Sequence, residues 1–172
     1  SPMLTLRINP ALDPASFART FAETKCVQVP NLFEDEVAAA LEKVRPGGLL
    51  MFITSRGTMD KLDSTLREML STRTEMLGAI RLPNDAFKRN AGTEVTTDII
   101  MLRKLRPGEA PTGTTWKETA DYTNDIGEAF NLNEYFATRP EMMLGRMRLS
   151  GRMYRDNEPT LESDKRDLGE AL

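Results

Sequence analysis

The chain contains no histidine and only one cysteine, Cys26, among its 172 residues. The absence of histidine excludes the commonest general base, the Ser-His and Cys-His nucleophile pairs, and most zinc and non-haem iron sites. A single cysteine excludes an internal disulfide and a cysteine-rich zinc site, and it fits a reducing compartment. We therefore expect a cytoplasmic chain with no metal site. Any catalysis would depend on carboxylates, lysine, tyrosine or a cofactor.

Long apolar runs and a strong charge of one sign are also lacking. No run approaches the roughly 18 apolar residues that indicate a membrane span, so no membrane partner is expected. The 23 basic residues nearly balance the 26 acidic ones. With such a balance the protein as a whole has no strong electrostatic attraction to nucleic acid, so any nucleic-acid binding must come from a local basic patch. With 40% hydrophobic residues, the composition is that of a globular chain with its own core.

The stretch VRPGGLLMFITSRGTMDK, residues 44–61, predicts an α/β fold. Its apolar run Leu49–Ile53 is continuous and too short for a membrane span, which indicates an interior parallel strand buried on both faces. The residues after this strand, Ser55, Arg56 and Asp60, would lie at the edge where open α/β sheets bind ligands. The alternative is a plain turn in which Thr58 or Asp60 caps the next helix.

Hydrophobic spacing and chain breakers predict further elements on both sides of this strand. Helices are expected over 13–25, 34–44 and 60–72, and strands over 26–29, 77–82 and 98–102. The loop at 83–97 is long for a compact domain, which favours a functional role. One or two short helices are expected before Gly145, and a polar, frayed tail after Tyr154.

The chain divides into four segments by composition and predicted elements. These are an N-terminal helix-strand-helix segment at 3–41, an α/β core at 42–105, a linker with short helices at 106–155, and a polar tail at 156–172.

Three blocks of sequence carry a resemblance: LEKVRPGGLLMFITSRGTMDK, AFKRNAGTEVTTDIIMLRK and NEYFATRPEMMLG. Together they resemble the C-terminal part of the adenine-specific DNA methyltransferase domains found in large helicase-methylase proteins of phages and mobile elements. The resemblance covers about residues 38–155. It implies an α/β fold with a partial Rossmann-like methyltransferase sheet of three core strands in mixed directions, flanking helices and a helical C-terminal extension. Strands 49–54, 77–82 and 98–103 would be the fifth, sixth and seventh of that sheet, the seventh antiparallel and inserted between the other two.

The motifs that carry chemistry in that family are missing. Such enzymes hold S-adenosylmethionine with a glycine-rich turn, because glycine lets the backbone approach the cofactor, and this sequence has no G-x-G. They also use an Asn-Pro-Pro-aromatic motif to bind the flipped target base. This sequence has no Pro-Pro pair, and the elements that follow its Asn9-Pro10 are not those that follow the motif in the family. We therefore expect no catalytic residues and no bound cofactor.

The first 40 or so residues resemble a second family. INPALDPASFARTFAETKCVQVPNLFEDEVAAAL is similar to the N-terminal lead-in of iron and 2-oxoglutarate dependent oxygenases. That family binds iron with two histidines and a carboxylate, which a chain without histidine cannot supply. The sequence therefore resembles fragments of two enzymes joined in one chain, and each fragment lacks the part that carries the catalytic residues of its family.

Several basic and polar residues are candidates for contacts with nucleic acid or a partner. The candidates are Arg56 after the apolar strand, Lys88, Arg89, Asn90 and Thr93 in the long loop, and Arg146, Arg148, Arg152 and Arg155 in the run GRMRLSGRMYR. The alternatives are a helix-capping turn, a loop that only packs on the sheet, and a solvated basic face balanced by the acidic tail.

These observations favour a non-catalytic protein derived from a methyltransferase that binds a macromolecule, protein or DNA, in a mobile-element setting such as a restriction or other defence complex. One alternative is a fragment of a split methyltransferase whose second chain supplies the cofactor site. Another is a recombination product without a selected function. The loss of the fourth strand predicts an open edge at 49–54. That edge could be covered by Cys26–Val29 or by a second copy, and we expect a homodimer through it or through the apolar surface around Leu62, Leu66 and Met69.

Overall fold

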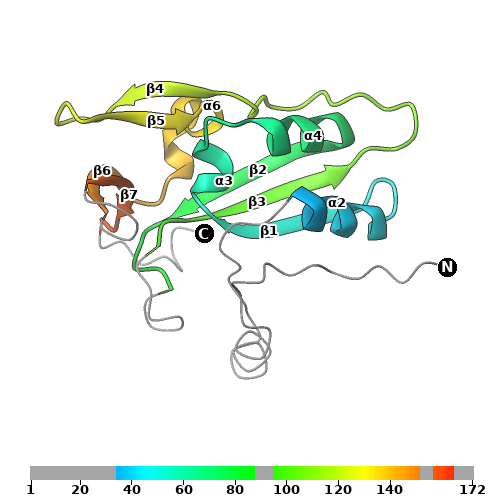
Figure 1. The fold of residues 1–172 in the computed structure, drawn as a ribbon, viewed down its shortest axis with the longest axis horizontal. Helices are drawn as coiled ribbons and strands as arrows, with labels where there is room; N and C mark the ends of the chain where they lie inside the picture. Colours follow the sequence, from blue (N-terminus) through cyan, green and yellow to red (C-terminus); the bar gives the residue numbers. More distant parts are fainter. Residues whose placement is uncertain (1–33, 88–94, 152–156, 165–172) are drawn as a thin grey trace.

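The computed structural model describes residues 34–87, 95–151 and 157–164. The expected helix at 13–25, the expected strand at 26–29 and part of the loop at 83–97 lie outside these ranges. The main sheet consists of β1 (Leu49–Ser55), β2 (Thr74–Leu82) and β3 (Thr97–Lys104). Its order is β1-β3-β2, and β3 is antiparallel to both neighbours (Figure 1). The expected insertion of strand 98–103 between the other two, antiparallel to them, is confirmed.

Helices α2 (Glu34–Lys43) and α4 (Thr65–Arg73) pack on one face of this sheet. The buried core joins residues of that face to Val37 and Leu41 of α2 and to Leu70 of α4; the residues from the sheet are Leu50, Met76, Ala79, Ile100 and Leu102. An ion pair between Arg73 and Glu42 links the two helices. We call this the inner face of the sheet.

The prediction that Leu49–Ile53 is an interior strand buried on both faces is wrong. Among the described residues β1 pairs only with β3, so it is an edge strand. Its side chains alternate between the inner face and an outer face, on which Leu49 is 70% and Met51 65% exposed. A continuous apolar run does not reveal which of its residues are exposed, because the alternation arises from the pleat and not from residue type. Because β3 lies between β1 and β2 and runs opposite to both, the hydrogen-bonded neighbours in the sheet are all antiparallel.

The expected helix at 60–72 begins later than predicted, at Thr65. A single turn, α3 (Gly57–Asp60), follows β1 directly, and α4 begins five residues later, after the connection 61–64. The side chain of Arg67 holds this connection in place by donating to the carbonyls of Thr58 (3.2 Å), Lys61 (2.7 Å) and Lys117 (2.7 Å). Satisfying these carbonyls lets the chain turn sharply in a buried position.

The one or two short helices expected before Gly145 are confirmed, but the expectation of a helical C-terminal extension is otherwise wrong. The only α-helix described after β3 is the short α6 (Glu134–Thr138), which is followed by a 3-10 turn, η1 (Pro140–Met142). Two antiparallel hairpins flank these turns: β4 (Thr119–Thr123) with β5 (Ala129–Asn133), and β6 (Arg146–Gly151) with β7 (Glu158–Glu162). Figure 1 shows both hairpins at the left-hand end of the molecule.

The turn residues of the first hairpin are a signal that the sequence-based expectation did not use. Asn124 accepts hydrogen bonds from the backbone N–H groups of Ile126 and Glu128, and Gly127 has a φ of 84°. These are the residue types that close tight turns.

The expected polar tail contains β7, whose Thr160 and Leu161 are buried. No helix within the described ranges has the length and apolar character needed to span a bilayer.

We expect Gly145→Ala to destabilise the protein by about 1–3 kcal/mol, the usual range for overpacking. A Cβ atom at this position would lie 2.2 Å from the backbone oxygen of Glu162, so the β6–β7 pair must shift. Urea unfolding measures the change. Gly57→Ala is the matched control, because the nearest atom to its new Cβ would be 3.7 Å away. Equal stability of the two variants would contradict the described hairpin pairing.

Candidate functional site

The end of β1 leads directly into a polar cluster. Arg56 follows Ser55 and donates its backbone N–H to the carbonyl oxygen of Thr96 (3.1 Å), beside the start of β3. The turn α3 then places Asp60 over the inner face, where it is 6% exposed. The sequence therefore brings a basic and an acidic residue to the strand end at which a ligand was expected.

Arg81 of β2 lies at the centre of this cluster and is fully buried. It donates to both oxygens of Asp60 (2.8 and 3.0 Å) and to both oxygens of Asp98 (2.7 and 2.8 Å). Its guanidinium also lies over the ring of Phe136, 4.4 Å from the ring centre. One planar cation thus makes bidentate contacts with two carboxylates, an arrangement that fixes geometry as well as charge.

The charges of the cluster are set by burial and pairing. Burial lowers the pKa of Arg81, but the attraction of Asp60 and Asp98 outweighs burial and raises that pKa overall. Burial raises the pKa of Asp98, with Arg81 opposing the shift. Arg81 therefore remains a cation, and its role is to hold both carboxylates in the interior.

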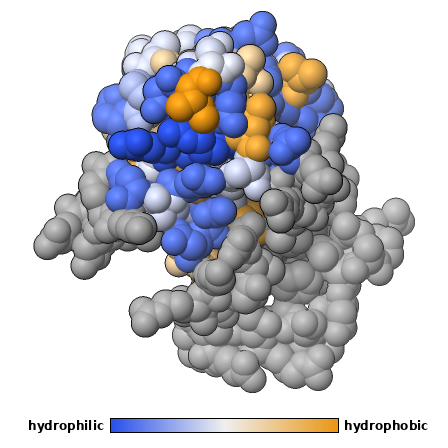
Figure 2. Space-filling model, turned by 90° about the vertical axis from the view of Figure 1, so that its left-hand side faces the viewer, coloured by the Kyte–Doolittle hydropathy of each residue, from blue (hydrophilic) through white to orange (hydrophobic). Residues whose placement is uncertain are grey.

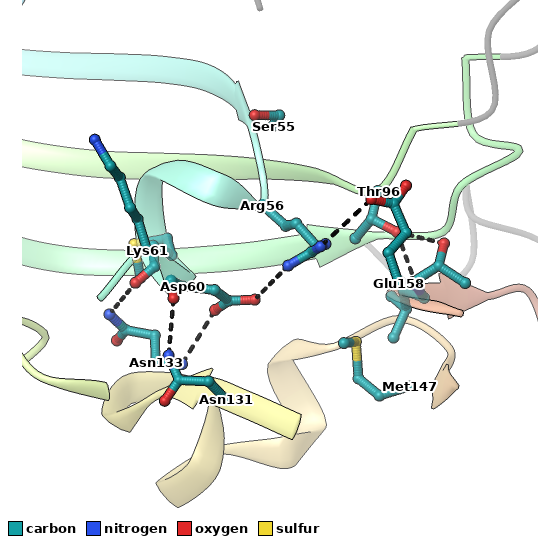
Figure 3. Close-up of polar contacts among 12 residues, drawn as sticks. Ser55, Arg56, Asp60, Lys61, Thr96, Asn131, Asn133, Met147 and Glu158 are labelled. Atoms are coloured by element: carbon teal, nitrogen blue, oxygen red, sulfur yellow. Dashed lines mark hydrogen bonds and ion pairs between the residues drawn. The ribbon is translucent and has the colours of Figure 1, made fainter. Parts of the chain in front are cut away.

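Arg56 connects the buried cluster to the surface. Its side chain is 25% exposed and lies 3.9 Å from Asp60 on one side and 3.9 Å from Glu158 of β7 on the other (Figure 3). Burial lowers the pKa of Arg56, while the attraction of Asp60 opposes that shift. The candidate contact residue Arg56 is thus placed at the expected strand end, where its charge faces two carboxylates of the same chain.

Asp60 is also held by residues of β5. The backbone N–H of Asn133 donates to its carboxylate (3.1 Å), and the side-chain amide of Asn131 donates to its carbonyl oxygen (2.9 Å). The Asn133 amide donates in turn to the carbonyls of Met59 (2.8 Å) and Trp116 (2.9 Å). These bonds restrain the carboxylate from several directions, which suits a structural role better than proton transfer to a substrate.

Hairpin β6–β7 is attached beside this cluster through two threonines. The hydroxyls of Thr96 and Thr160 lie 3.0 Å apart, and Thr96 Oγ1 accepts from the backbone N–H of Leu161 (2.7 Å). The carbonyl of Leu161 accepts from the backbone N–H of Asn84 (2.8 Å). The strand ends of the main sheet are therefore covered by this hairpin. Figure 2 views that end of the molecule and shows hydrophilic residues over most of the coloured surface, with separate hydrophobic spots.

Two of the predicted arginines of the basic run lie on β6. Arg148 is paired with Asp125 (2.7 Å) and is 16% exposed, whereas Arg146 is exposed. The hydrogen bond from Arg148 lowers the pKa of Asp125 and keeps that carboxylate charged. Arg148 is thus neutralised within the chain. The remaining candidates lie outside the described residues: Lys88, Arg89, Asn90, Thr93, Arg152 and Arg155.

A shallow cavity of about 390 Å³ lies apart from the cluster. Residues of α4, of the start of β2 and of the segment 111–117 line it, and several of them carry hydroxyls, including Thr72, Thr74 and Thr114. The hydroxyl of Ser71, another lining residue, is buried without a hydrogen-bond partner among the described residues. In the same ranges no group of three or more acidic or thiol side chains is arranged to hold a metal ion.

The central residue of the cluster, Arg81, was absent from the sequence-based candidates. One signal was available: Arg81 interrupts the apolar strand LGAIRL, and Asp98 opens the apolar strand DIIML. A charge within a strand expected to be buried requires an opposite charge nearby. This rule would have paired Arg81 with an acid, although it would not have identified Asp60.

We expect Arg81→Met to lower the free energy of unfolding by about 3–5 kcal/mol, because it leaves two buried carboxylates without their cation. Urea unfolding monitored by circular dichroism measures the loss. Arg106→Met is the control: the Arg106 side chain is 65% exposed, and exposed ion pairs contribute about 1 kcal/mol or less. Near-equal stability of the two variants would show that the cluster is not structural.

Comparison with known proteins gives one partial similarity. No protein-family model matches the chain, and no solved structure matches it. Defense against restriction protein B of Escherichia phage P1 is 37% identical to the chain over 65 residues. That segment is 37% of this chain and 3% of the phage protein, so the chain spans a very small part of its relative's length.

Proposed function

We propose that this chain is a non-catalytic phage protein, derived from a methyltransferase, that acts by binding a component of a restriction or other defence complex. The observation that carries the proposal is the 37% identity over 65 residues with Defense against restriction protein B. Because that similarity covers 3% of the relative, the activity of the whole phage protein is not transferred to this chain.

The strand order supports the methyltransferase origin. In the family that the sequence resembles, the seventh strand lies antiparallel between the fifth and the sixth. The order β1-β3-β2 is compatible with that arrangement, with β1, β2 and β3 in the places of the fifth, sixth and seventh strands. We propose this correspondence for the three strands of the main sheet.

The polar cluster argues against catalysis. A catalytic group needs an open position for a reacting atom. Here Asp60 and Asp98 are both engaged by Arg81, and Arg56 faces the carboxylates of Asp60 and Glu158. The charged groups at the ends of the strands therefore satisfy one another, and the geometry favours a role in stability.

We favour a protein partner over DNA, and we place the interaction in the cytoplasm. Arg148, one of the predicted phosphate contacts, is paired with Asp125, and Glu128 and Glu162 also lie within electrostatic reach of it. These acids oppose binding of a polyanion at β6. The proposal includes contacts between the partner and Arg56, Arg146 and the candidate residues outside the described ranges.

We also propose that the chain acts as a homodimer.

A second candidate is a component of a split adenine-specific methyltransferase. It is favoured by one observation: in the described residues, no strand pairs with the outer edge of β1, where a fourth strand would lie in the complete sheet. A separate chain carrying the cofactor-binding half could supply that strand.

We expect the chain to protect incoming DNA without modifying it. In a restricting bacterial host, expression of the chain should raise the transformation efficiency of unmodified plasmid. Plasmid recovered from a host that expresses the chain but has no restriction-modification system should still be cut by the matching restriction enzyme. The destabilised Arg81→Met variant and a non-restricting host are the controls. Methylated plasmid would contradict the non-catalytic proposal and favour the split enzyme, whereas unchanged efficiency would argue against a role in defence.

We expect no binding of S-adenosylmethionine tighter than about millimolar, which corresponds to roughly −4 kcal/mol, because the glycine turn is absent from the sequence. Isothermal titration of the full chain measures this affinity. A micromolar binding signal from the isolated chain would overturn the proposal.

A further inference from the structure

We infer that the outer edge of β1 is a self-association surface, occupied by the β1 strand of a second copy in antiparallel pairing centred on Phe52. The inference rests on the proposed function, of which the homodimer is a part. It assigns the interface and the register to residues that the structure describes.

The backbone groups that point outward from β1 follow from its pairing with β3. Gly48 accepts from the backbone N–H of Lys104 (2.8 Å), and the N–H of Arg56 donates to Thr96 (3.1 Å). Between these two residues the register is continuous. Because inward and outward backbone groups alternate along an antiparallel strand, the N–H and C=O groups of Leu49, Met51, Ile53 and Ser55 point toward the outer edge.

The opposite edge of the sheet is already engaged. Arg81 of β2 forms a bridge with Met143 beside η1, and its carbonyl accepts from the backbone N–H of Leu144 (2.9 Å). Among the described residues, the edge of β1 has no such partner. The two edges therefore differ, and β1 is the one available for strand addition.

Sequence protection against strand addition is also missing from β1. Exposed edges are commonly blocked by lysine, other charges, proline or a bulge. The strand LLMFITS has no charge and no proline, and its register with β3 is regular. By contrast, β2 carries a bulge between Met76 and Gly78. The exposed apolar side chains of β1 lie on its outer face: Leu49 (70% exposed), Met51 (65%) and Ile53 (37%).

A second copy fits this edge because β1 is compatible with itself. When two β1 strands are centred on Phe52, Met51 lies opposite Ile53 of the other copy and Leu49 lies opposite Ser55. The outward backbone groups then face one another at each of these pairs. No charged residue lies opposite a like charge, since the strand has none, and the exposed apolar side chains of the two copies become neighbours.

We expect a dimer that dissociates on dilution. One added strand covers a small area, and interfaces below about 1,200 Å² are typically transient. Sedimentation of the full chain over a concentration series should approach twice the 19.3 kDa chain mass. Met51→Lys should reduce the mass to that of one chain, because a lysine on the edge strand opposes pairing.

Leu62→Lys is the matched control for that substitution. Leu62 is 80% exposed in the connection 61–64 and is not part of β1, so this variant should dimerise like the original chain. Leu66 and Met69, the other residues of the second predicted surface, are partly buried against the core, whereas Met51 is exposed. Unchanged circular dichroism confirms that each variant folds. A chain that stays monomeric at the highest concentration, or a Met51→Lys variant that stays dimeric, overturns the inference.

Disulfide formation tests the register. In a Cys26→Ser background, Met51→Cys and Ile53→Cys proteins should cross-link when mixed, because directly opposed residues in a hydrogen-bonded pair have Cα atoms about 5.5 Å apart, within disulfide range. Each protein alone should cross-link poorly, since identical positions would be diagonal neighbours about 7–8 Å apart. Strong self-linking of Met51→Cys would overturn this register.

These outcomes are separate from those of the proposed function. Methylation of plasmid DNA would refute the non-catalytic role and leave the dimer result unchanged. A monomeric chain that still protects incoming DNA would refute the dimer and leave the defence role standing.

Discussion

The fold depends on the pairing of one buried guanidinium with two carboxylates. Arg81 comes from β2, Asp98 from β3, and Asp60 from the turn after β1. An unpaired charge in the interior would be very costly, so the three elements must come together before any of these groups can be buried. The pairing specifies which segments meet, and apolar packing alone would specify this less strictly.

The arrangement of the three core strands was predictable, and their exposure was not. Leu49–Ile53 was recognised as a strand because it is short, apolar and bounded by Gly48 and Gly57. The position of β3 came from a resemblance between sequences, not from the periodicity of any segment. The exposure of Met51 was unpredictable because it depends on what covers the outer face, and neighbouring elements are not encoded in the residues of the strand itself.

The candidate site was only partly predictable. Arg56 was placed correctly at the end of β1, but its partners Asp60 and Glu158 come from different elements, one of them near the C-terminus. The arginine run was a candidate for phosphate contacts, with a solvated face balanced by the acidic tail as the alternative, because consecutive residues show only local charge. Asp125, which neutralises Arg148, precedes it by 23 residues and reaches it through the turn of the β4–β5 hairpin. Ion pairs between residues of two different hairpins cannot be predicted until the hairpins themselves are known.

The hydrogen bond from Asn133 to Asp60 joins residues that are 73 positions apart. On a ribosome adding about 5–20 residues per second, those two residues are made roughly 4 to 15 seconds apart. Throughout that interval the Asp60 carboxylate and the Met59 carbonyl lack the amide donors that later bind them, so they stay hydrated. Until β3 has been made as well, β1 and β2 lack the strand that lies between them, so binding of these apolar segments by a chaperone would compete with folding.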